Sequence, residues 1–164
     1  MRRDDAGALL VHPVILGALA LWAVNDHWLK TFGGWLPGKL SDVACLIVIP
    51  VLVGGAIELA TGRRGSRWLF GAAALAALIM ALINTWAPAA WAYEQGLGLM
   101  QWPFHGLAAL VRGDGWPGHR SVVLTMDATD LVTLPGSLVP VWLERRRSSH
   151  PAKPICDRGT KRAA

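Results

Sequence analysis

Charged side chains are scarce in this chain of 164 residues, of which 16% are charged and 53% are hydrophobic. Soluble domains carry roughly 25% charged residues, so an ordinary soluble protein is a poor fit and much of the apolar surface is expected to meet lipid. The same apolar content excludes an intrinsically disordered chain. Only two cysteines are present, Cys45 and Cys156, which excludes a disulfide framework.

Motifs of several well-known enzyme classes are also missing, because the sequence contains neither an H-E-x-x-H zinc motif nor a G-x-S-x-G nucleophile motif. The formal net charge is +5, but many basic residues lie in short runs beside apolar segments. We therefore expect no nucleic-acid partner. The expected partners are membrane lipids, and either further copies of this chain or another membrane protein.

Long apolar runs dominate what is present. At a rise of ~1.5 Å per residue, a helix of roughly 20 apolar residues crosses the ~30 Å hydrocarbon layer. Four segments approach this length and are predicted to cross as helices: 6–24, 43–60, 68–87 and 121–143. The predicted fold class is therefore all-α, a membrane helical bundle of four transmembrane helices within residues 1–143. Residues 144–164 form a basic tail that we expect to be disordered and cytoplasmic.

The start of the fourth segment is open, because it contains two carboxylates, Asp127 and Asp130. In one alternative its helix begins at Asp127, which is then the N-cap. In the other it begins near Ser121, and both carboxylates then lie in the outer part of the bilayer. A fifth apolar stretch, 89–111, holds several polar side chains and is broken by glycines. It is predicted to be an interfacial or re-entrant helix between helices 3 and 4.

The distribution of basic residues predicts the orientation. In a four-span arrangement the N-terminus, the loop 61–67 and the C-terminal tail share one side, and they hold 12 of the 16 basic residues. These are Arg2, Arg3, Arg63, Arg64, Arg67, Arg145, Arg146, Arg147, Lys153, Arg158, Lys161 and Arg162. The positive-inside rule then places both termini in the cytoplasm. A fifth crossing would place the basic tail outside.

Polar side chains gather at the opposite, outer ends of the four segments. The candidate polar cluster comprises Asn25, Asp26, His27, Lys30, Lys39, Ser41, Asp42, Asn84, Asp127 and Asp130. A lipid-facing position would be costly for so many such groups, so we expect them to face one another or a water-filled pocket. Asp127, Asp130, Thr133 and Ser137 form a stripe that should point into the bundle. Asp26 and Lys30, at i and i+4, would form an ion pair if the first helix continues.

Structural roles compete with a site at several of these positions. Ser41 followed by Asp42 is typical of a helix N-terminus, in which Ser41 caps and Asp42 complements the dipole. Asp127 and Asp130 resemble a capping box with Asp in place of Glu. Lys30 and Lys39 are equally consistent with anchors that extend to the membrane surface.

Three blocks carry a resemblance: NDHWLK (25–30), GKLSDVACL (38–46) and DATDLVTLP (127–135). With them the chain resembles a family of small, uncharacterised bacterial polytopic membrane proteins. Two positions depart from the family pattern, Cys45 where Gly is common and Ala128 where Pro is common, and neither removes a charge. The resemblance implies a multi-pass protein of the bacterial cytoplasmic (inner) membrane and carries no activity.

Two functional hypotheses follow. The first is an integral membrane protein with an outward-facing acidic cluster that serves as a binding, assembly or transport component. The alternative is a membrane-embedded, metal-dependent hydrolase acting on a lipid or lipid-linked substrate, in which a divalent metal activates water. Its candidate metal ligands are Asp26, His27, Asp42, Asp127 and Asp130.

Overall fold

The computed structural model describes residues 9–62 and 65–149, and in this part of the chain all regular elements are helices, without strands. Its elements are α1 (Pro13–His27), η2 (Leu29–Phe32), α2 (Trp35–Thr61), α3 (Ser66–Thr85), α4 (Ala87–Val111), η3 (Ala128–Ser137) and α5 (Leu138–Ser149). The predicted all-α class is thus confirmed. The first eight residues, Arg63, Arg64 and the tail beyond Ser149, with Cys156, lie outside the described residues.

Helix α1 begins where the sequence supplies both a cap and a proline. Nδ1 of His12 accepts a hydrogen bond from the backbone N–H of Val14, and Pro13 occupies the first helical position, where its missing N–H costs nothing. The helix continues to His27, beyond the predicted end at residue 24. Asn25 and Asp26 therefore lie on the last turn of the helix.

Helix α2 begins at Trp35, two turns earlier than predicted, after Gly33 and Gly34 turn the chain with φ values of 68° and 100°. Glycine tolerates these left-handed angles, which other residues rarely adopt. Ser41 consequently lies inside the helix, and the prediction that it is the N-cap is wrong. Pro50 stays within α2, as a membrane helix permits.

Two helices of the described chain, α2 and α3, are long and apolar enough to cross a membrane. Only 39% of the most apolar 18-residue window of α2 and 28% of that of α3 is buried. A helix at the core of a soluble protein would be mostly covered by its neighbours. Most residues of these two windows are instead partly or fully exposed, among them Leu52, Val53, Leu75 and Leu78.

The fourth apolar segment is a 3-10 helix followed by an α-helix. Asp127 is the N-cap of η3, and its side chain accepts a hydrogen bond from the N–H of Thr129. The helix therefore starts after Asp127, the first of the two predicted alternatives. Pro135 lies inside η3 and removes one backbone donor. Helix α5 continues to Ser149, so the first residues of the predicted tail are helical.

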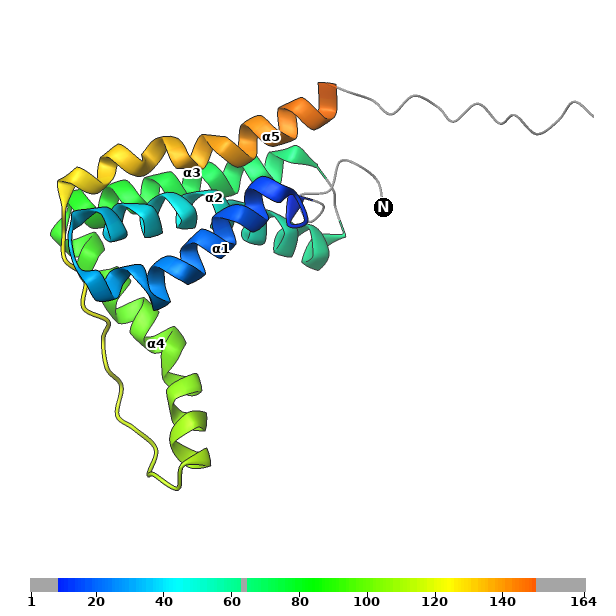
Figure 1. Ribbon diagram of the computed structural model, residues 1–164. Coiled ribbons are helices and arrows are strands. Elements are labelled where there is room, and N and C mark those ends of the chain that lie inside the picture. Colours follow the sequence, from blue (N-terminus) through cyan, green and yellow to red (C-terminus); the bar gives the residue numbers. More distant parts are fainter. Residues whose placement is uncertain (1–8, 63–64, 150–164) are drawn as a thin grey trace, which may run out of the picture.

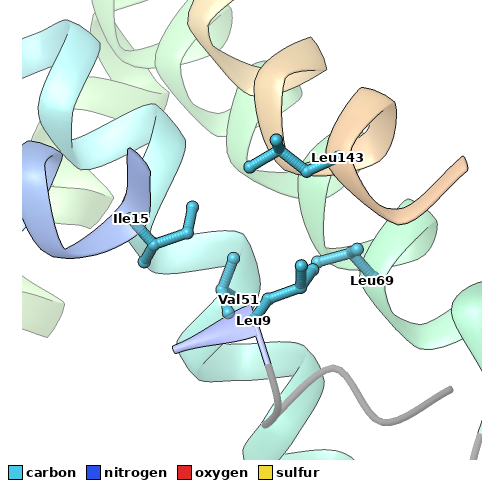
Figure 2. Packing of buried hydrophobic residues seen from close by; sticks show 5 residues of the cluster. All are labelled: Leu9, Ile15, Val51, Leu69 and Leu143. Carbon is cyan, nitrogen blue, oxygen red and sulfur yellow. The ribbon is translucent and has the colours of Figure 1, made fainter. Parts of the chain in front are cut away.

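The bundle is formed by α1, α2, α3 and the continuous segment η3–α5 (Figure 1). Helices α2, α3 and α5 run side by side, and α1 packs obliquely against α2. Toward the end where α5 finishes, Leu9, Ile15, Val51, Leu69 and Leu143 meet in an apolar cluster (Figure 2). All five are at most 5% exposed. We call the opposite end, where α1 ends and α2 begins, the polar end.

Helix α4 leaves the polar end and projects away from the bundle, crosswise to α2, α3 and α5 (Figure 1). Residues 112–127 begin with a turn and contain no helix. They return beside α4 to the start of η3. We call α4 together with residues 112–127 the arm. The predicted separate helix over 89–111 is therefore present, and it is not part of the bundle.

Candidate functional site

Lys39 lies at the centre of the polar end and is only 6% exposed. Its Nζ donates hydrogen bonds to Oδ2 of Asp127 at 3.1 Å, to Oγ1 of Thr129 at 2.7 Å and to Oδ1 of Asp130. A lysine ammonium has three donor hydrogens, so these oxygens occupy all of them. Nζ also lies 5.6 Å from the ring centroid of Trp35, within the range of a cation–π contact.

Thr129 holds the Asp127 carboxylate in place, in addition to Lys39. Its carboxylate accepts hydrogen bonds from the N–H and the hydroxyl of Thr129, both at 2.8 Å. These bonds, together with Lys39, lower the pKa of Asp127 to about 2, so the group is ionised at neutral pH. Its own N–H donates to Oδ1 of buried Asn84 at 3.1 Å, which ties the start of η3 to α3.

A second group of polar side chains joins the end of α1 to α2. Asp26 and Lys30 form the predicted ion pair at 2.8 Å, and the hydroxyl of Ser41 donates to Asp26 at 2.5 Å. Nδ2 of the fully buried Asn25 donates to the carbonyl of Pro37 at 2.7 Å and to Ser41 at 3.2 Å. Ser41 therefore connects the helices and does not cap one of them.

Asp42 lies on the same helix as Lys39 and Ser41, and its carboxyl group is close enough to Asp130 to interact with it electrostatically. Asp130 thus faces both Lys39 and Asp42. The structure brings together nine of the ten predicted cluster residues, in the two groups just described. The polar stripe also points inward, because Thr133 and Ser137 are 2% and 6% exposed.

His27 does not join this cluster. It is exposed, and its Nδ1 lies 2.9 Å from the carbonyl of Ala23 in its own helix. Among the described residues, no group of three or more His, Cys, Asp or Glu side chains is placed to hold a metal ion. A lysine ammonium stands between Asp127 and Asp130 instead, so the arrangement gives the predicted metal site no support.

Sequence reasoning missed two contributors, Thr129 and Trp35. The Asp-x-Thr spacing of residues 127–129 is typical of a side chain that bonds the backbone two residues on, and this could have identified Thr129. Trp35 stands at i−4 from Lys39, a spacing at which side chains meet on a helix. This spacing is informative only if Trp35 and Lys39 lie on the same helix, and the predicted helix began later, at residue 43.

The arm is held together by contacts between α4 and the returning segment. Glu94 accepts two hydrogen bonds there, from the N–H of Val122 to its carbonyl at 3.2 Å and from the N–H of Leu124 to its carboxylate at 2.8 Å. Nε1 of Trp102 donates to the carbonyl of Pro117 at 2.7 Å, and its ring lies edge-on to that of Trp116.

Two glycines of α4 permit this close packing. A Cβ on Gly98 would lie 2.4 Å from the carbonyl oxygen of Arg120, and one on Gly106 would lie 2.4 Å from the ring of Trp116. Real Cβ atoms essentially never approach other atoms so closely. The glycines that broke the sequence pattern of this stretch therefore make room for the returning segment.

A cavity of about 560 Å³ remains between α4 and the returning segment. Its lining includes Gln101, Trp102, His105, Arg112, Arg120 and Ser121. None of these residues was in the predicted cluster. The cavity and the polar end are thus separate features, connected through residues 122–127.

Comparisons of the chain with family models, with curated proteins and with solved structures returned no match.

Proposed function

We propose that the chain is a four-pass integral protein of the bacterial cytoplasmic membrane that acts as a binding or assembly component and not as a catalyst. Its passes are α1, α2, α3 and the segment η3–α5, and both termini are cytoplasmic. The length, the apolar composition and the low buried share of α2 and α3 support membrane insertion. The basic residues near the termini and in the loop 61–67 support the orientation.

The observation that carries the non-catalytic assignment is the saturation of Lys39. Its three donors are used by Asp127, Thr129 and Asp130, so this ammonium has no donor left for a substrate. A site that binds and activates a substrate needs free donors or acceptors aimed at that substrate. The cluster is better suited to holding α2, α3 and η3 together at their outer ends.

The arm is the part of the protein that binds at the membrane interface. The side of α4 that faces the returning segment carries Glu94, Gly98 and Trp102, whereas another side is apolar and exposed. The exposed apolar residues are Leu99, Met100, Phe104, Leu107, Leu110 and Val111, each at least 55% exposed. This two-sided pattern is typical of a helix that lies in the membrane interface.

The position of α4 agrees with an interfacial role. In Figure 1 the returning segment runs along the side of α4 that faces away from the bundle. The opposite side of α4 faces the hydrocarbon layer that the bundle is proposed to cross. The apolar residues would then rest on the hydrocarbon, and the returning segment would lie on the aqueous side at the outer surface.

Elemental analysis of the detergent-purified protein tests the non-catalytic assignment. The comparison is between wild type, Asp130→Asn and the control Asp114→Asn, whose carboxylate lies in the arm. We expect no stoichiometric divalent metal in any of them, and a lowered melting temperature in Asp130→Asn alone. A stoichiometric metal that is present in wild type and lost in Asp130→Asn would favour the membrane-embedded hydrolase.

A further inference from the structure

The cavity of the arm has walls that are fixed by specific contacts. On one side Gly98 and Gly106 bring the backbone of α4 against Arg120 and Trp116. On the other, the returning segment is tied by the hydrogen bond from Trp102 to Pro117 and by the two bonds to Glu94. These contacts border a space of about 560 Å³, which falls within the range of ~300–1,000 Å³ usual for small-molecule sites.

The polar lining of this cavity is rich in hydrogen-bond donors. Among the lining residues, Arg112 and Arg120 bear guanidinium groups, Gln101 an amide and Ser121 a hydroxyl. The only carboxylate among the lining residues is Asp114, which pairs with Arg112 at 3.2 Å. Across the described chain, no carboxylate forms an ion pair with Arg120. The cavity therefore offers one uncompensated positive charge beside neutral donors.

This chemistry fits a phosphate group. A guanidinium binds phosphate through two parallel hydrogen bonds, a geometry that a lysine cannot provide. Inorganic phosphate alone would leave much of the volume empty, so there is room for a substituent, and Trp102 offers it an apolar ring. Donors, charge and volume together favour a phosphate that carries a small polar group.

We propose that the cavity of the arm binds a phosphate-bearing anion through Arg120, with Gln101 and Ser121 as further donors. This inference deepens the proposed function and rests on it for the location, since it gives the arm a ligand at the outer membrane surface. The phosphate can come from a phospholipid headgroup or from a soluble phosphate compound. Both sources share the chemistry that the cavity recognises.

Titration of the full-length protein in a neutral detergent tests this proposal. The probes are inorganic phosphate and the short-chain lipid dihexanoylphosphatidylglycerol, at constant ionic strength, and binding is followed by calorimetry. The variant Arg120→Gln removes the guanidinium from the cavity. Arg67→Gln, at the opposite end of the bundle, removes the same charge without touching the arm.

We expect saturable binding of at least one probe that Arg120→Gln weakens about tenfold or more, the effect of losing a charged hydrogen bond. Arg67→Gln should bind as wild type does. Binding of the lipid alone would identify a headgroup as the source, and binding of phosphate alone would identify a soluble compound. Binding of both would support the shared phosphate chemistry. The proposal is overturned if neither probe binds saturably, or if the two variants bind equally well. Those results leave the topology and the metal analysis unaffected, so they are separable from failure of the proposed function.

Discussion

Single residues at the polar end show how a nearly buried charge is kept in a largely apolar protein. Lys39 is tolerated because three oxygen atoms accept its hydrogen bonds, and two of these atoms belong to carboxylates. Removal of one partner from a buried ion pair is far more damaging than removal of both, since the remaining charge has no compensation. The sequence identified Lys39, Asp127 and Asp130 as costly groups. Their pairing joins residues that are separated by 88 and 91 positions in the sequence, and no local pattern encodes such contacts.

Replacement of Lys39 by Met is expected to destabilise the protein strongly. It leaves Asp127 and Asp130 without their cation and beside Asp42, and the side chain of Asp130 is only 18% exposed, so water compensates this carboxylate poorly. The measurement is the free energy of unfolding by denaturant in mixed micelles. The double variant with Asp130→Asn should recover part of the loss, because one of the unpaired carboxylates is gone.

A matched control for this prediction is Lys30→Met. Lys30 also pairs with an aspartate, Asp26, but the two side chains are 49% and 38% exposed. Exposed pairs contribute about 0–1 kcal/mol, so this variant should be nearly as stable as wild type. Equal stability of the Lys39 and Lys30 variants would show that the Lys39 network does not hold the bundle together.

Among the elements, the arm is the one whose shape the sequence indicated least. The polar residues and glycines of 89–111 predicted a helix outside the bundle, and α4 confirms a separate helix. The same glycines gave no indication of what packs on them. The returning segment lacks regular hydrogen bonding of its own, so its path is set by side chains such as Glu94 and Trp102.

Alanine at Gly98 is expected to detach the returning segment from α4, because its Cβ would lie 2.4 Å from the carbonyl oxygen of Arg120 and the backbone would have to move. Hydrogen exchange at the amides of Val122 and Leu124, both bonded to Glu94, should become about fivefold faster, since a typical hydrogen bond contributes ~1 kcal/mol. The control is Gly96→Ala on the same helix, where nothing lies within 4 Å. Unchanged exchange in the Gly98 variant would show that the close contact does not position the segment.

For the whole molecule, the central question is how the bundle and the arm lie relative to the membrane. The proposed orientation places the arm and the polar end outside and the start of α3 near the cytoplasm. It rests on the positions of the basic residues and on the apolar surfaces of α2, α3 and α4.

Cysteine labelling checks this orientation. In a background with Cys45 and Cys156 replaced by Ser, Gly115→Cys places a thiol in the arm and Ser66→Cys places one at the start of α3. A membrane-impermeant maleimide should label the Gly115 variant in intact spheroplasts and the Ser66 variant only after lysis. The reverse pattern would mean that the arm is cytoplasmic.

The sequence by itself determined the helical class, the apolar segments and the gathering of polar residues toward one end, because composition and spacing along the chain carry this information. Tertiary structure decided that Ser41 joins two helices, that Lys39 stands between Asp127 and Asp130, and that α4 and its returning segment enclose a cavity. These features arise from contacts between distant parts of the chain. They depend on how the elements pack, which the pattern of any one segment does not specify.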